Sequence, residues 1–237
     1  MSDAARETQP ESAAAPPARA APAERFIPAW RSPGAWGLML AVTAAGLAID
    51  LWTKAAAFAR VAGPPVRILR EDVLAVGPDR LATLIPMHEP VVVAERLLHF
   101  TLVLNPGAVF GIGAGRRWFF VLFTVLALAF CLWTFGMWTR SRDRLTHIGL
   151  GLIIAGGLGN LYDRLSFACV RDFIHPLPGV RLPFGLRWPG GSPDVWPYVS
   201  NVADAFLIIG IVLLLWYSFR APPHGQPPGA SDPERVA

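Results

Sequence analysis

Apolar residues gather in four long runs along the chain, and polar segments separate these runs. The runs cover residues 34–51, 118–138, 145–162 and 202–219. Each is close to the roughly 20 residues that an α-helix needs to cross a bilayer. The pattern predicts an integral membrane protein of mainly α structure, with four transmembrane helices in one domain over residues 30–220.

Short loops rich in arginine indicate the side of the membrane on which each segment lies. The arginines between the second and third runs, before the first run and after the fourth are Arg140, Arg142, Arg144, Arg25, Arg31 and Arg220. Because short cytoplasmic loops carry an excess of Lys and Arg, both termini are predicted to be cytoplasmic. Residues 55–117 and 163–201 then lie outside, and a long translocated segment is largely exempt from the charge rule.

The two extracytoplasmic segments are expected to differ in structure. The stretches 90–94 and 97–104 are rich in β-branched and apolar residues, which predicts strands of a small extracytoplasmic β-sheet. Residues 176–197 contain six prolines and two tryptophans, a composition typical of an irregular loop at a membrane surface. We expect this loop to lie over the functional site as a mobile cover.

Composition excludes several other classes. The chain is 53% hydrophobic and 16% charged, and its net charge of +4 comes from basic residues that stand singly or in short groups. A nucleic-acid surface would need a basic stripe, so nucleic acid is not an expected partner. Residues 1–29 and 221–237, rich in Ala or Pro and without apolar periodicity, are predicted to be disordered cytoplasmic tails.

The two cysteines do not indicate a disulfide or a metal site. Cys131 lies inside the second run and Cys169 lies beyond the third, so the two side chains are expected at different depths. Neither cysteine has the partner spacing of a zinc site. We expect no metal and no cofactor, and we expect a monomer.

Polar residues at the ends of three runs fall on one face of the membrane under the predicted topology. They are Asp50, Lys54, Asn160, Asp163, Arg164, Asn201 and Asp204. Within each helix their spacing is i, i+3 or i, i+4, which places them on common faces. Singly, such residues are explained as charges that snorkel to water or as amides that link helices, and Asp172 as a solvated loop carboxylate. Together they predict one shared polar pocket.

Five sequence blocks follow one another in the order found in a known family. They are Asp50-Leu51-Trp52-Thr53-Lys54, Asn105-Pro106-Gly107-Ala108-Val109-Phe110, Gly156-Gly157-Leu158-Gly159-Asn160-Leu161-Tyr162-Asp163-Arg164, Val170-Arg171-Asp172-Phe173 and Asn201-Val202-Ala203-Asp204. These blocks resemble those of lipoprotein signal peptidase, also called signal peptidase II. The chain departs from the usual pattern at Leu51, Ala168 and Ser200, where Gln, Gly and Phe are common.

The resemblance implies an aspartic endopeptidase of the bacterial inner membrane. Such an enzyme cleaves prolipoproteins just before a diacylglyceryl-modified cysteine, with membrane lipids around it and its active site at the outer face. Its catalytic dyad corresponds here to Asp172 and Asp204. The supporting or substrate-binding positions correspond to Asp50, Lys54, Asn105, Gly107, Asn160, Asp163, Arg164, Asn201 and Ala203.

The residues themselves agree with acid–base chemistry but leave other classes open. Two carboxylates in a partly desolvated pocket tend to share one proton, so one can act as base and the other as acid. The principal alternative is a small membrane transporter or ion-binding protein, which would also gather carboxylates and Asn among its helices. Transporters usually place such sites near the midplane and contain internal repeats. A non-catalytic structural membrane protein would leave the pairing of Asp172 with Asp204 unexplained.

Overall fold

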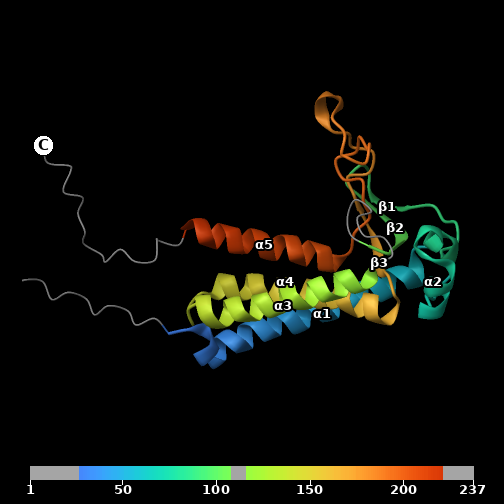
Figure 1. Ribbon diagram of the computed structural model, residues 1–237. Coiled ribbons are helices and arrows are strands. Elements are labelled where there is room, and N and C mark those ends of the chain that lie inside the picture. Colours follow the sequence, from blue (N-terminus) through green and yellow to red (C-terminus); the bar gives the residue numbers. More distant parts are fainter. Residues whose placement is uncertain (1–26, 108–115, 221–237) are drawn as a thin grey trace, which may run out of the picture.

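Four long helices lie side by side in the computed structural model, which describes residues 27–107 and 116–220 (Figure 1). They are α1 (Pro33–Arg60), α3 (Arg117–Trp138), α4 (Arg144–Ser166) and α5 (Val202–Arg220). Each is long and apolar enough to cross a membrane. The predicted four-helix membrane fold is therefore confirmed.

Helix α4 lies at the centre of the bundle, in contact with α1, α3 and α5. Glycines allow this close packing. A Cβ atom at Gly210 of α5 would lie 2.6 Å from the carbonyl oxygen of Gly149, and one at Gly156 would collide with the carbonyl oxygen of Ala203. Small residues at such contacts let helix backbones approach closely inside a membrane.

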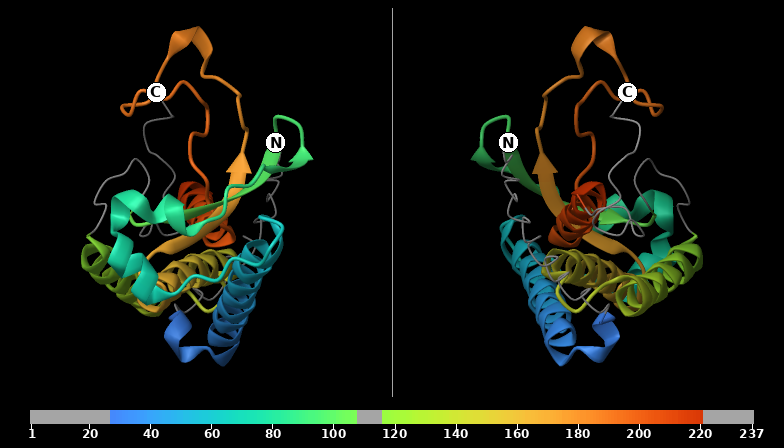
Figure 2. Two further views of the ribbon diagram at one scale, coloured as in Figure 1. Left: turned by 90° about the vertical axis from the view of Figure 1, so that its right-hand side faces the viewer. Right: turned by 90° about the vertical axis from the view of Figure 1, so that its left-hand side faces the viewer.

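A three-stranded antiparallel sheet continues the molecule beyond one end of the bundle (Figures 1 and 2). Its strands are β1 (Val91–Ala94), β2 (Leu98–Asn105) and β3 (Val170–Pro176), in the order β1-β2-β3. The first two confirm the strands predicted at 90–94 and 97–104. The third was not predicted as a strand, because its first four residues are all buried and give no period-two alternation.

An apolar core joins the sheet to the helices. The short helices α2 (Arg70–Val76) and η2 (Pro78–Leu84) contribute Val73 and Leu81 to this core, where they meet Leu102 of β2 and Phe173 of β3. Helix α1 continues past the predicted end at residue 51 so that Phe58 reaches the same core. Its 28 residues extend about 42 Å, longer than the ~30 Å hydrocarbon layer of a bilayer.

The segment between β3 and α5 forms a narrow arm, residues 177–198, that rises away from the bundle (Figures 1 and 2). Its base is fixed beside the sheet, because Ile174 and Ser200 exchange backbone hydrogen bonds of 2.8 Å. The predicted loop therefore starts and ends next to the predicted site. Its motion as a cover stays a prediction.

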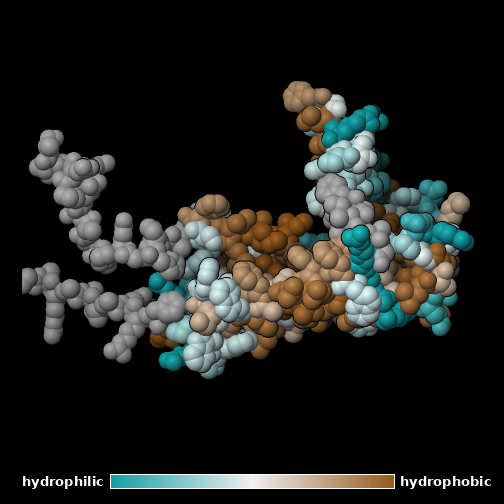
Figure 3. Space-filling view, in the orientation of Figure 1, coloured by the Kyte–Doolittle hydropathy of each residue, from teal (hydrophilic) through white to brown (hydrophobic). Residues whose placement is uncertain are grey.

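The surface of the molecule differs between the helical bundle and the sheet. Apolar side chains dominate the helices, whereas hydrophilic side chains gather around the sheet (Figure 3).

At the end of the bundle opposite the sheet, the short helix η1 (Ala29–Arg31) packs against the α3–α4 link, and Ala29 is fully buried. Ala29, the last residue of the tail predicted for 1–29, is thus packed against the described bundle. Residues 1–26, 221–237 and 108–115, which include Ala108, Val109 and Phe110 of the second sequence block, lie outside the described residues.

Candidate active site

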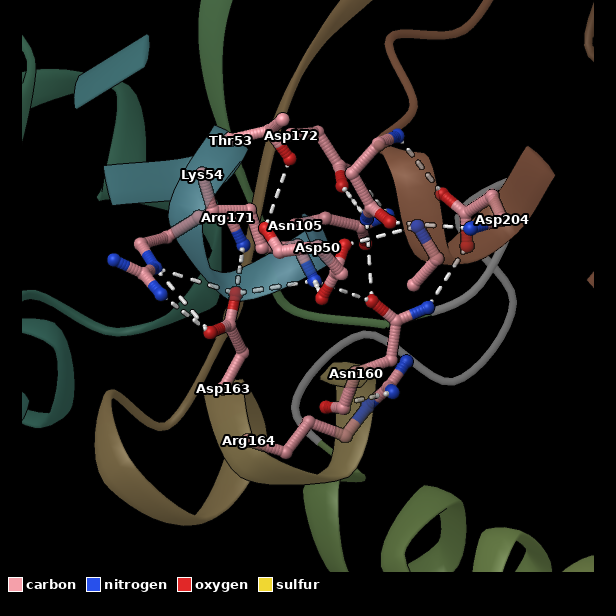
Figure 4. A network of polar contacts seen from close by, with 12 residues as sticks. Asp50, Thr53, Lys54, Asn105, Asn160, Asp163, Arg164, Arg171, Asp172 and Asp204 are labelled. Atoms are coloured by element: carbon pink, nitrogen blue, oxygen red, sulfur yellow. Dashed lines mark hydrogen bonds and ion pairs between the residues drawn. The ribbon is translucent and has the colours of Figure 1, made fainter. Parts of the chain in front are cut away.

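The polar residues singled out in the sequence meet where the helices end and the sheet begins (Figure 4). They come from five elements. Helix α1 supplies Asp50 and Lys54, β2 supplies Asn105, α4 supplies Asn160, Asp163 and Arg164, β3 supplies Asp172, and the start of α5 supplies Asn201, Ala203 and Asp204. Gly107 follows β2, where its N–H donates to the Asn105 side chain at 3.0 Å. The structure thus brings all of the predicted site residues together.

Asp204 is held in place by the start of helix α5. The Asn201 side-chain oxygen accepts the backbone N–H of Asp204 at 3.2 Å, and the Asp204 carboxylate accepts the backbone N–H of Asn201 at 3.1 Å. This reciprocal pair satisfies two N–H groups that a helix terminus otherwise leaves without partners. The other Asp204 oxygen accepts the Asn160 amide at 2.8 Å. The same residues therefore begin the helix and orient the carboxylate.

Asp172 lies on the other side of Asn201. The Asn201 side-chain amide donates to one carboxylate oxygen of Asp172 at 2.6 Å, and the Asn105 amide donates to the other at 3.0 Å. The strand register places this carboxylate, because Asp172 on β3 pairs with Val103 on β2 and Asn105 lies two residues further along. Asn201 thus contacts both carboxylates.

The two carboxylates differ in burial. Asp172 is 1% exposed, whereas Asp204 is only partly buried. Burial, followed by the nearby charge of Asp204, raises the pKa of Asp172 to about 8, while the amides of Asn201 and Asn105 act in the opposite direction. Two nearby carboxylates cannot both ionise cheaply in a desolvated pocket. Burial therefore favours the protonated form of Asp172.

A buried ammonium group sets the orientation of Asn160. Lys54, which is fully buried, donates to Asp50 and to the side-chain oxygen of Asn160, both at 2.9 Å. Because an ammonium group can only donate, the Asn160 oxygen must face Lys54, and its NH₂ group must then face Asp204. Lys54 thus acts on Asp204 through the Asn160 amide.

Asp163 is paired with a residue that sequence analysis did not select. Its carboxylate accepts the guanidinium of Arg171 at 2.8 Å and the Arg171 backbone N–H at 3.0 Å, and it lies 3.6 Å from Lys54. The adjacent Arg164 instead donates to the carbonyl oxygens of Asn160 and Gly107, with its guanidinium 5.2 Å from the centre of the Phe120 ring. The sequence could have indicated Arg171 as a site residue, because it directly precedes Asp172.

Two small residues are needed where α1, α4 and α5 meet. The other oxygen of Asp50 accepts the backbone N–H of Ala203 at 2.9 Å, and Ala203 is fully buried. A Cβ atom at Gly159 would collide with the Asp50 carboxylate. These contacts connect the buried ions of α1 to the start of α5, and hence to Asp204.

Residues 27–107 and 116–220 contain no group of three or more His, Cys, Asp or Glu side chains that could hold a metal ion. In this part of the chain the polar cluster contains the carboxylates of Asp50, Asp163, Asp172 and Asp204, the side-chain amides of Asn105, Asn160 and Asn201, and the cations of Lys54, Arg164 and Arg171. Such a set can bind a water molecule between an acid and a base and hold an amide bond beside it.

Sequence comparison relates most of the chain to one family. The family model for signal peptidase II matches residues 42–220. The chain is 36% identical to the lipoprotein signal peptidase of Desulfitobacterium hafniense over 127 residues, which cover 54% of this chain and 72% of that protein. It is 31% identical to the lipoprotein signal peptidase of Rhodopirellula baltica over 216 residues, 85% of this chain and 81% of that protein.

The fold agrees with this relationship. The structure is similar to a bacterial membrane enzyme solved by the in meso method at 1.9 Å resolution, with a TM-score of 0.53 and 22% identity over 78% of this chain and 95% of that chain. A 2.3 Å structure of a bacterial membrane enzyme, also solved in meso, gives a TM-score of 0.52 and 22% identity over 81% and 95%. The match over residues 42–220 shows that this multi-pass membrane protein belongs to the signal peptidase II family.

Proposed function

We propose that this chain is an aspartic endopeptidase that cleaves prolipoproteins just before a diacylglyceryl-modified cysteine. Family membership supports a peptidase that processes prolipoprotein signal peptides. The observation that carries the aspartic chemistry is the placement of Asp172 and Asp204 on either side of Asn201, with one carboxylate buried and the other partly open.

In the proposed mechanism, Asp172 starts protonated and Asp204 starts ionised. Asp204 takes a proton from water as the oxygen attacks the scissile carbonyl carbon, and Asp172 gives its proton to the carbonyl oxygen. The tetrahedral intermediate then collapses. Asp204 protonates the departing amine, and Asp172 regains a proton from the intermediate, so both groups return to their starting states without a covalent intermediate.

The remaining polar residues are proposed as positioning or substrate-binding groups. Asn160, Asn201 and Asn105 hold the carboxylates at fixed angles, as the hydrogen bonds in Figure 4 indicate. Arg164, which is partly exposed and donates to the carbonyl oxygens of Asn160 and Gly107, is the group proposed to bind a substrate carbonyl. Asn160 is proposed to be kept in its productive orientation by Lys54, which is itself paired with Asp50 and Asp163.

The active site is proposed to face the outside of the bacterial inner membrane. A lipid-anchored cysteine and an apolar signal helix both present the scissile bond near the membrane surface, which suits a site at the sheet end of the bundle. Cysteine labelling in spheroplasts should find positions Leu74 and Gly190 reachable from outside, and Ser141 protected. The reverse pattern would contradict this orientation.

Replacement of each carboxylate by an amide tests the chemistry most directly. Asp172→Asn and Asp204→Asn should each lower prolipoprotein cleavage below detection, because an amide cannot exchange the proton that the mechanism requires. Both proteins should still accumulate in the membrane, and their unfolding temperatures should be close to that of the unsubstituted protein. Substantial cleavage by either variant would remove that residue from the dyad.

The pH dependence tests which carboxylate holds the proton. Cleavage should fall as pH rises above about 8, because Asp172 then loses its proton. The raised pKa also means that the folded protein binds a proton that the unfolded chain releases, so stability should fall as pH rises from about 4 to about 8. Asp172→Asn should remove this slope. If the stability of Asp172→Asn falls with pH as steeply as that of the unsubstituted protein, the proton is held by another group.

The alternative of a small transporter has less support. The polar cluster lies at one end of the helices, beside the sheet, whereas transporter sites usually lie at the bilayer midplane. The family match is to peptidases throughout.

A further inference from the structure

The arm, residues 177–198, projects from the sheet end of the molecule at a large angle to the helices (Figure 1). It rises clear of the bundle in both views of Figure 2 as well. With four helices crossing a bilayer, an element perpendicular to them runs parallel to the membrane plane. The arm leaves the molecule beside the sheet and the start of α5 (Figure 1), at the end of the bundle where a membrane–water boundary is expected.

Internal hydrogen bonds make the arm a preformed structure. Leu182 donates to the Pro193 carbonyl and Val195 donates to the Val180 carbonyl, both at 2.7 Å, so the outgoing and returning chains form a ladder. Near the turn, the Trp188 ring N–H donates to the carbonyl of Asp194 at 2.8 Å. The hydrogen bonds that define the arm's shape thus lie within the arm itself.

The outer part of the arm is apolar and exposed. The short helix η4 (Pro183–Gly185) carries Phe184, which is 98% exposed, and Leu186 beside it is 58% exposed. Phe184 also has a left-handed backbone, with φ of 57°. A bulky residue in that conformation costs free energy, and here the side chain that it presents packs on nothing in the described chain.

Charge and apolar surface are divided between the sides of the arm. In Figure 3, the spheres at its tip are brown or tan toward the helices and teal on the side away from them. Arg181 and Arg187, both exposed, flank the apolar residues. Arg187 donates to the Gly191 carbonyl at 3.0 Å. An exposed apolar surface flanked by arginines is typical of interfacial elements that contact lipid phosphates and the upper acyl chains.

From these observations we propose that the arm is a membrane anchor: Phe184 and Leu186 enter the leaflet nearest the sheet, and Arg181 and Arg187 bind its lipid phosphates. The bound partner is the bilayer itself, not a protein or the active site. The arm's base is fixed at Ile174 and Ser200, close in sequence to Asp172 and Asp204. Anchoring would thus fix the depth of both carboxylates relative to lipid. This inference depends on the membrane-spanning helices and not on the proposed peptidase chemistry.

Fluorescence quenching in lipid nanodiscs tests the anchor. Phe184→Cys is labelled with bimane, as is Glu95→Cys, a control in the exposed turn between β1 and β2. The native Cys131 and Cys169 are buried, and the unsubstituted protein measures their background. Lipids with a doxyl group high on the acyl chain should quench the label at 184 and not at 95, and aqueous iodide should do the reverse.

Two results would overturn the proposal. Iodide quenching at 184 as strong as at 95 would place the arm in water, and protection of 184 from both quenchers would place it against protein, as a lid would be. Charge reversal then tests the arginines: Arg181→Glu with Arg187→Glu should reduce lipid quenching at 184 in nanodiscs of anionic lipid. Unchanged quenching would exclude their contact with phosphates.

Discussion

Helices α3 and α4 are similar in length and both are apolar enough to span a membrane, yet they have opposite roles. Over the most apolar 18 residues of each, 56% of α4 is buried inside the bundle, against 17% of α3. Helix α3 presents large side chains such as Phe123 and Leu126 outward. Helix α4 combines glycines with Asn160 and Asp163. Small and polar residues, not overall hydropathy, therefore decide which helix organises the site.

The largest expected effect is a loss of stability when the buried ion pairs of α4 are broken. Asp163→Ala would leave Arg171 without its partner and Lys54 with fewer neighbours of opposite charge. Breaking a buried pair by removing one partner costs about 3–5 kcal/mol. Thermal and urea unfolding in detergent should detect this loss. Asp163→Leu combined with Arg171→Met should recover part of the stability, and no recovery would show that the ions are not the cause.

The next largest effect is on the cleavage rate, which substitutions in α4 should lower and a control substitution in α3 should not. Asn160→Ala removes the amide that Asp204 accepts, and loss of one such positioned donor lowers a rate by about 10²–10³-fold. Arg164→Ala and Asn201→Ala should also slow cleavage without the complete loss expected for the dyad. The control on α3 is Thr134→Ala, since the Thr134 hydroxyl is buried and has no hydrogen-bond partner within residues 27–107 and 116–220. Initial cleavage rates that match for Asn160→Ala and Thr134→Ala would contradict the proposed role of α4.

A matched pair of glycine substitutions gives the smallest effect. In α4, a Cβ at Gly156 collides with the Ala203 carbonyl, whereas in α3 the nearest atom to a Cβ at Gly136 is 3.9 Å away, in Trp30. Gly156→Ala should therefore lower stability by about 1–3 kcal/mol. Gly136→Ala should raise it by up to about 1 kcal/mol, because alanine favours helix. The two unfolding midpoints should move in opposite directions, and a shift of the same sign would weaken the distinction between the helices.

Part of the candidate site was predictable because polar positions repeat along helices, whereas Asn105 and Asp172, which lie on strands, were selected only through the resemblance to signal peptidase II. Asp50 and Lys54, and Asn201 and Asp204, lie one turn apart, so each pair shares a face whatever the tertiary structure. Strand β3 was missed because four buried residues in a row give no alternating pattern. The partner of Asp163 could not be chosen from sequence either, since Arg164 and Arg171 offer the same chemistry.

The sequence by itself determined four membrane-spanning helices and a polar cluster at one end of them, because a bilayer requires long apolar runs and makes every interruption costly. Tertiary structure decided which atoms meet. The β2–β3 register placed Asp172 beside Asn105, Lys54 fixed the orientation of the Asn160 amide, and the arm turned away from the bundle with Phe184 exposed. These outcomes depend on contacts between segments far apart in the chain, where differences of an ångström decide the hydrogen-bond partners.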